Sequence, residues 1–263
     1  MQYNTILVTK DGPVSTITLN RPDKLNAYNM PMVAELLHAI DKVRRDDSTW
    51  VLVITGAGRG FCAAADLSGG EPYGEETLLP HLVGMRDGFH QVVLSLSRLD
   101  KPTIASINGP ATAGGLAMAL ACDLRIASDR AVFRETSLMF GYIPDEGGSY
   151  FLPRIVGLEK ALELILLSDR IDAHEAKRIG LVGKVVPHEE LGEATRELAV
   201  RLGNGPPIAL RMSKRAVYRQ LDMDLENALE DLAQGAQIVN DTDDVAEGSR
   251  AFFEKRKPIF KGR

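Results

Sequence analysis

Residues 101–121 read KPTIASINGPATAGGLAMALA. Residues 103–108 form a largely apolar run typical of a buried β-strand, and residues 116–121 are almost wholly apolar, as in a buried helix. Only small residues and a proline separate the two, in a turn that ends on Gly114-Gly115. A strand that passes through a Gly-rich turn directly into a helix predicts an α/β fold with a mostly parallel sheet, in which ligands bind at the carboxyl ends of strands.

The same alternation extends in both directions from this segment. Apolar runs at residues 5–8 and 14–19 flank an Asp11-Gly12 pair, which predicts a β-hairpin. Asn29 is a suitable N-cap for the helix that follows, and Pro31 suits its first turn. The other predicted elements are strands at residues 50–55, 124–127 and 183–186 and helices at residues 81–99, 159–167, 174–179 and 191–202.

Two regions depart from the alternating pattern. Residues 56–80 are polar and rich in Gly and Pro, so we expect a loop, which is the best candidate for a mobile lid; Tyr73 and His81 could line a pocket beneath it. From about Gly205 onward the sequence is helical, which predicts a main domain at residues 1–204 and a helical region at 205–263. Thr242 begins the last predicted helix.

Composition excludes several classes of protein. A formal net charge of −5 and a pI near 5.6 argue against nucleic-acid binding, which needs a basic surface. Cys62 and Cys122 have no partner at disulfide or metal-ligand spacing, so we expect two buried free thiols and no metal. No apolar run reaches the roughly 20 residues that span a bilayer, and no signal sequence is evident. A soluble cytoplasmic protein is the expectation.

Two Gly-rich turns, at residues 55–66 and 108–115, could hold an anion. Backbone N–H groups at the start of a helix are free to bind negative charge. Alternatively, both segments are tight turns, with Gly114-Gly115 allowing close helix–sheet packing. A dinucleotide-binding turn is excluded because Phe61 stands where a third glycine is needed, and no phosphate-binding Gly-Lys-Ser/Thr loop occurs. The Tyr and Lys pair of short-chain dehydrogenases is also missing.

Three motifs stand in order along the chain: LNRPDKLNA at residues 19–27, FCAAAD at 61–66 and KPTIASING at 101–109. Together with residues 141–157 and 252–257, they resemble the motifs of the crotonase (enoyl-CoA hydratase/isomerase) superfamily over nearly the whole chain. The resemblance implies an α/β spiral of ββα turns followed by a C-terminal helical trimerisation region. It also implies a homotrimer or a dimer of trimers.

The resemblance also implies an acyl-CoA thioester as substrate, with no cofactor beyond its coenzyme A moiety. By position, the backbone amides of Ala65 and Gly114 form an oxyanion hole for the thioester carbonyl, where they stabilise an enolate. The implied contacts to coenzyme A come from Lys24, Ala27, Ala63 and Asp66, with Phe252 and Lys255 serving the coenzyme of a neighbouring subunit. Solvated charge for the two lysines, and core packing for Phe252, are the alternative readings.

The sequence departs from the hydratase pattern at decisive places. Hydratases of this superfamily hold water between two glutamates, whose positions here carry Ala117 and Ser137. Alanine cannot transfer a proton, and a serine hydroxyl is too weak an acid or base without activation. Ala64 and Ala113 also replace frequent glycines beside the two oxyanion donors, which alters the turns or narrows the pocket.

Asp145 follows Pro144 at the position where enoyl-CoA isomerases of this superfamily commonly carry a catalytic acid, and Glu146 could take its place. A single carboxylate in an apolar pocket can move a proton between two carbons without bound water. Alternatively, either residue caps the helix after Gly147. The sequence thus favours an enoyl-CoA isomerase. A hydratase, a related hydrolase or decarboxylase, and a catalytically silent acyl-CoA-binding subunit remain alternatives. The histidines, including His81 and His90, show no catalytic or metal-binding spacing.

Overall fold

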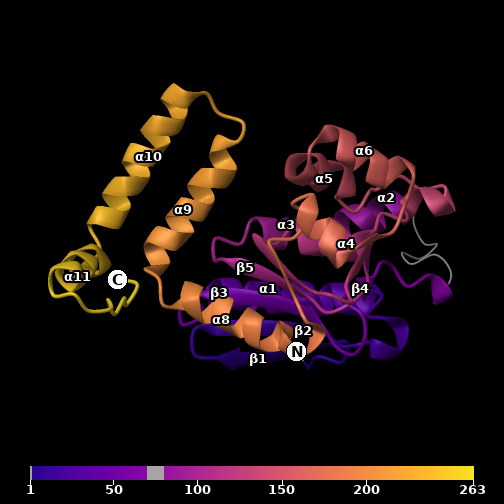
Figure 1. Cartoon of the computed structure of the whole chain (residues 1–263), viewed down its shortest axis with the longest axis horizontal. Helices are drawn as coiled ribbons and strands as arrows, with labels where there is room; N and C mark the ends of the chain where they lie inside the picture. Colours follow the sequence, from indigo (N-terminus) through magenta and orange to yellow (C-terminus); the bar gives the residue numbers. More distant parts are fainter. Residues whose placement is uncertain (1, 70–79) are drawn as a thin grey trace.

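The computed structural model describes residues 2–69 and 80–263 (Figure 1). Its larger sheet has the strand order β1-β2-β3-β5-β7-β10. The predicted hairpin is present, since β1 pairs with β2 in antiparallel fashion, while the remaining neighbours are parallel. The six strands are β1 (Ile6–Asp11), β2 (Val14–Leu19), β3 (Val51–Gly56), β5 (Thr103–Ile107), β7 (Leu124–Ser128) and β10 (Lys184–Val186).

The central strands of this sheet are buried on both faces, as their continuous apolar runs predicted. On β3, Leu52 and Ile54 join a core that includes helix α1 (Met30–Arg45), while Val51 and Val53 face the opposite way and pack with helix α8 (Leu191–Gly203). Asn29 caps α1 as predicted, because its side chain accepts a hydrogen bond from the amide of Met32 at 3.1 Å.

A second, smaller sheet has the order β4-β6-β8-β9. Each of β3, β5 and β7 leads into a short strand of this sheet, which makes the spiral of ββα turns that the crotonase resemblance implied. The residue pattern missed these strands because most of them are too short to show a period of two. They are β4 (Cys62–Ala63), β6 (Ala111–Thr112), β8 (Val132–Arg134) and β9 (Ile171–Asp172).

The single helix predicted at residues 81–99 is wrong. The chain forms α2 (Pro80–Gly84), a π-helical turn (Met85–Phe89) and α3 (His90–Ser97), and Gly88 has non-helical angles of φ −107° and ψ −106°. Glycine adopts such angles without steric cost, so the break occurs there. The other core helices are α4 (Gly114–Leu120), α5 (Gly148–Val156), α6 (Leu158–Leu166) and α7 (Ala173–Arg178), with short 3-10 turns at Pro22–Lys24, Leu67–Gly69, Ser137–Phe140 and His188–Glu190.

The C-terminal region consists of α9 (Pro207–Gln220), α10 (Leu225–Asn240) and α11 (Asp243–Phe253). Figure 1 shows α9 and α10 as an antiparallel hairpin that projects away from the sheets. Polar contacts attach α9 to the core: Lys214 pairs with Asp123 at 2.7 Å, and Tyr218 donates to the same carboxylate. This arrangement is compatible with the predicted boundary near residue 205 and with the predicted trimer or dimer of trimers. The boundary and the oligomeric state both stay predictions.

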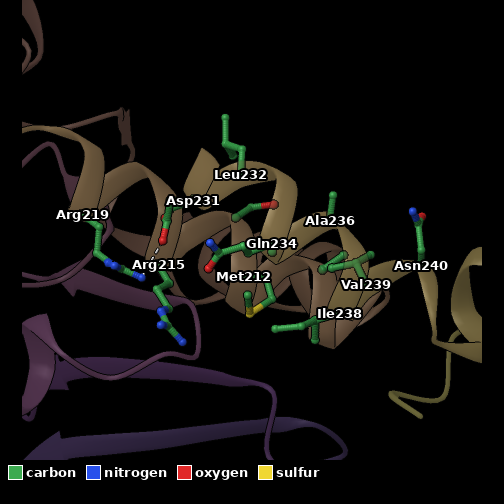
Figure 2. Close-up of a pocket in the computed structure, with 14 residues that line it drawn as sticks. Met212, Arg215, Arg219, Asp231, Leu232, Gln234, Ala236, Ile238, Val239 and Asn240 are labelled. Atoms are coloured by element: carbon green, nitrogen blue, oxygen red, sulfur yellow. Dashed lines mark ion pairs between the residues drawn. The ribbon is translucent and has the colours of Figure 1, made fainter. Parts of the chain in front are cut away.

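A cavity of about 510 Å³ lies between α9 and α10. Figure 2 shows Met212, Ile238 and Val239 on its walls, and the ion pair between Arg219 and Asp231, at 2.7 Å, spans the two helices. This cavity belongs to the hairpin alone, because none of its lining residues comes from the spiral.

Both cysteines are buried and free, as predicted, and burial raises the pKa of each thiol to about 12. Within residues 2–69 and 80–263, no His, Cys, Asp and Glu side chains gather in a group that could hold a metal ion. In the same part of the chain, no helix combines the length and the apolar character needed to cross a membrane.

Candidate active site

A cavity of about 260 Å³ lies between the two Gly-rich turns. Its walls are mostly small, aliphatic or aromatic side chains, and two carboxylates, Asp145 and Glu146, reach it. The loop predicted as a lid, at residues 56–80, borders the cavity through Leu67, and His81 directly after the loop also lines the cavity. Tyr73 and the rest of residues 70–79 lie outside the described residues. The remaining lining residues are Tyr28, Ala63, Ala64, Ala65, Met85, Thr112, Ala113, Thr136, Ser137, Phe140 and Tyr142.

The first predicted donor, Ala65, lies on one wall of this cavity. Ala65 forms a parallel bridge with Tyr28, in which Tyr28 donates to the Ala64 carbonyl and Asp66 donates to the Tyr28 carbonyl, both at 2.8 Å. The Ala65 amide takes no part in this pairing and stays available for a ligand. Ala64 keeps the left-handed angle that a glycine would adopt, with φ 66°, so its side chain narrows the pocket without altering the turn.

The second predicted donor, Gly114, is the first residue of α4, where an N–H group has no acceptor within its own helix. Ala113, the residue before Gly114, stands where relatives frequently have glycine and has a φ of 40°. The backbone therefore keeps the positive φ of a glycine turn, at the cost of some strain at Ala113. Gly115 does serve close packing, because a Cβ there would overlap the Cys62 carbonyl. At Gly114, a Cβ would instead overlap the side chains of Glu146 and Tyr28.

Glu146 is buried, with 8% of its surface exposed, and the Tyr28 hydroxyl donates to its Oε1 at 2.5 Å. Burial raises the pKa of Glu146 from its ordinary 4.5 to about 7. Hydrogen bonds from Tyr28 and from the Gly114 amide oppose this shift, while the charges of Asp145 and Glu135 add to it. Glu146 therefore holds a proton for much of the time near neutral pH, immediately beside the second predicted donor.

Asp145 lies at the more open side of the cavity and is held by two histidines. Its Oδ2 is 2.7 Å from Nε2 of His81, and its backbone carbonyl is 2.7 Å from Nε2 of His90. The ring of His81 also lies parallel to that of Tyr142, with centroids 5.7 Å apart. His81 therefore lines the cavity, as the sequence analysis expected, and also fixes the Asp145 carboxylate, a contact that the spacing of the histidines did not indicate.

The alternative reading of the two acids as helix caps is also wrong. The N-cap of α5 is Gly147, and the hydrogen bonds of the carboxylates go elsewhere, from Asp145 to His81 and from Glu146 to Tyr28. Both acids are therefore available to a molecule in the cavity.

Comparison with known proteins agrees with this geometry. Residues 9–263 match the family described as enoyl-CoA hydratase/isomerase. The chain belongs to this family. It is 36% identical to the short-chain-enoyl-CoA hydratase of Clostridium acetobutylicum, over 98% of this chain and 97% of that protein. It is 35% identical to the 1,2-epoxyphenylacetyl-CoA isomerase of Escherichia coli, over 98% of both chains. The crystal structure of enoyl-CoA hydratase from Bacillus anthracis superposes with a TM-score of 0.93 at 37% identity, over 99% of this chain and 100% of that one.

As a member of the hydratase/isomerase family, the chain lacks a carboxylate at both expected glutamate positions. Ala117 is fully buried inside α4, and Ser137 lines the cavity. The Ser137 hydroxyl nevertheless donates to Oε1 of the buried Glu135 at 2.7 Å. Neither Glu135 nor Tyr28 was predicted. No local signal marks them, because Tyr28 meets an acid 118 positions away and Glu135 lies outside the family motifs quoted above.

The predicted coenzyme-binding residues divide into two groups. Ala63 lines the cavity, and Ala27 accepts a hydrogen bond from Arg21 at 2.6 Å. Asp66 is bound by Ser68 and by Arg21, which together lower its pKa, and Lys24 lies 3.4 Å from the Ser68 hydroxyl. These residues form one polar rim beside the cavity. Arg21 also belongs to this rim, although no coenzyme-binding role was predicted for it.

Phe252 and Lys255 lie apart from this rim. Phe252 is 79% exposed, and Figure 1 places α11 on the other side of the molecule from α5 and α6. The structure does not bring either residue to the cavity of its own chain. Their predicted role toward the coenzyme of a neighbouring subunit stays a prediction.

The raised pKa of Glu146 predicts a dependence of stability on pH. The folded chain holds this proton up to about pH 7, whereas the unfolded chain releases it near pH 4.5. The resulting stabilisation is complete below pH 4.5 and is lost as the pH rises through 7. Between pH 5 and pH 8, we expect wild type to lose more than about 1 kcal/mol of unfolding free energy relative to Glu146→Gln. Urea unfolding at one protein concentration measures this, and parallel profiles of the two proteins would contradict it.

Proposed function

We propose that this chain is an enoyl-CoA isomerase, which moves a proton between the α and γ carbons of an enoyl-CoA thioester. The observation that supports this reading is the pair of carboxylates at residues 145 and 146. They share a cavity with Ala65 and with Ala113, the residue before Gly114, whereas the two hydratase positions carry alanine and serine.

In this mechanism, the thioester oxygen accepts hydrogen bonds from the Ala65 and Gly114 amides. Removal of a proton from the α carbon, or from the γ carbon of a conjugated enoyl group, then gives an enolate, whose charge builds up on that oxygen. Prealigned donors stabilise such a charge, and one donor is typically worth about 100-fold to 1000-fold in rate. Asp145 takes the proton from one carbon and returns it two carbons away, while His81 holds its carboxylate in position.

A second candidate, hydration of the double bond, has one specific observation in its favour. Ser137 occupies one of the two glutamate positions of the hydratases, and its hydroxyl donates a hydrogen bond to Glu135. A water at Ser137 could pass its proton to Glu135 through that hydroxyl. Hydration and isomerisation would then differ in which carboxylate is required.

Incubation with straight-chain enoyl-CoAs in heavy water tests the proposed function. We expect substrates whose double bond shifts position and which gain deuterium at the α or γ carbon, with no gain in mass equal to a water molecule. Mass spectrometry and the ultraviolet absorbance of the conjugated thioester measure both changes. Addition of water without a shift would favour the hydratase, and calorimetric binding without any exchange would favour the silent acyl-CoA-binding subunit.

A further inference from the structure

The pair formed by Tyr28 and Glu146 takes no part in the proton shift described above, although both residues line the cavity. Tyr28 is 2% exposed, and its ring stacks on Phe89 with centroids 4.0 Å apart. Its hydroxyl donates to Glu146 Oε1. A buried carboxyl group held on one side by a fixed phenol has a defined orientation, so its second oxygen can be aimed at a ligand.

Glu146 also approaches the Gly114 amide closely. A Cβ at position 114 would overlap both Glu146 Oε1 and the Tyr28 ring, so only glycine leaves room for this approach. The Gly114 amide lies close enough to the carboxyl group to lower the pKa of Glu146, in opposition to burial. A thioester oxygen that binds to the Gly114 amide would therefore lie against Glu146.

The charge on Glu146 decides what this proximity does. An ionised carboxylate would repel an enolate oxygen, whereas a neutral carboxyl group can donate a hydrogen bond to it. Burial and the nearby acids Asp145 and Glu135 favour the neutral form, so a substantial fraction of Glu146 keeps its proton near neutral pH. A carboxylic acid kept neutral in this way, beside a tyrosine and opposite a separate carboxylate base, is an established route to stabilise an enolate.

We propose that protonated Glu146 donates a third hydrogen bond to the thioester oxygen beside the Gly114 amide, with Tyr28 holding its other oxygen. This inference rests on the proposed function only in requiring an enolate. It does not depend on whether the proton returns to the α or the γ carbon. Asp145 remains the proton carrier, and the two neighbouring acids have different tasks because their surroundings differ.

The test compares Glu146→Gln with Glu146→Ala. Glutamine keeps the shape and a neutral N–H donor, so we expect its kcat to stay within about tenfold of wild type. Alanine removes the donor, so we expect kcat to fall by about 100-fold or more, with little change in affinity for coenzyme A thioesters. Tyr28→Phe should give a smaller loss, since it releases the carboxyl group without removing it. The assay is exchange of the α proton of saturated and β,γ-unsaturated acyl-CoAs in heavy water, which requires the base and the enolate but no shift of the double bond.

A pH profile separates this role from a structural one. The kcat of wild type should fall as the pH rises through 7 and Glu146 ionises, while Glu146→Gln should not show this fall. The titratable groups around Glu146 are Tyr28, Cys62, Glu135 and Asp145, together with His81 and His90, which hydrogen-bond to Asp145, and all six are the same in both proteins.

Three results would overturn the proposal. Equal loss in the Gln and Ala variants would make Glu146 a proton carrier, and full activity in both would remove it from the site. Absence of both α-proton exchange and a shift of the double bond in wild type would remove the enolate itself. Exchange without any shift of the double bond would instead contradict the isomerase function while leaving the role of Glu146 to be decided by the same variants.

Discussion

Gly114→Pro is expected to lower turnover of any accepted enoyl-CoA by about 100-fold to 1000-fold relative to Gly114→Ala. Proline lacks the N–H group that the mechanism directs at the thioester oxygen, and proline is compatible with the first position of a helix. Gly114 occupies that position in α4. The measurement is kcat for the isomerisation or for α-proton exchange in heavy water.

The alanine variant is the matched control for this substitution. Both replacements add a Cβ that overlaps Glu146 and Tyr28, so both disturb the same two side chains. Only proline also replaces the N–H group, by its ring, so the ratio of the two rates removes the effect of the added Cβ from the loss of the amide. Equal rates in two variants with the same thermal midpoint and the same coenzyme A affinity would show that the Gly114 amide does not bind the thioester oxygen.

The sequence predicted those parts of the fold that depend on neighbouring residues. The hairpin around Asp11-Gly12, the Asn29 cap and the buried β3 all follow from local pattern, and the structure contains each of them. The local residue pattern did not predict the break at Gly88 or the short strands of the second sheet. Strands of two or three residues have almost no periodicity, and they exist because the spiral brings them together.

The site follows the same division. The two Gly-rich turns stand out in the sequence because small residues at helix starts have a local meaning. The contacts that hold the two acids join Tyr28 to Glu146 and His81 to Asp145, across 118 and 64 positions, and no local pattern reports contacts between residues so far apart in the sequence. The positive φ at Ala64 and Ala113 is equally hidden, since alanine is not the residue that such angles favour.

Asp145→Asn should lower isomerisation by at least about 100-fold, the loss expected for a general acid/base, while acyl-CoA affinity changes little. Asparagine cannot accept and return a proton. It keeps the shape of aspartate, and its Oδ1 can still accept the hydrogen bond from His81 that now holds the carboxylate at 2.7 Å. The fold and the position of the side chain should therefore survive, so the loss should appear in kcat and not in KM.

Glu146→Gln is the matched control, because it makes the same carboxyl-to-amide change at the adjacent residue in the same cavity. A proton carrier at Asp145 and a neutral donor at Glu146 predict a large loss in the first variant and a small one in the second. The reverse order would assign the proton transfer to Glu146, whose pKa of about 7 suits that task as well. Near-normal rates in both variants would leave Glu135, behind Ser137, as the remaining buried acid next to the cavity, and would favour hydration over the proton shift.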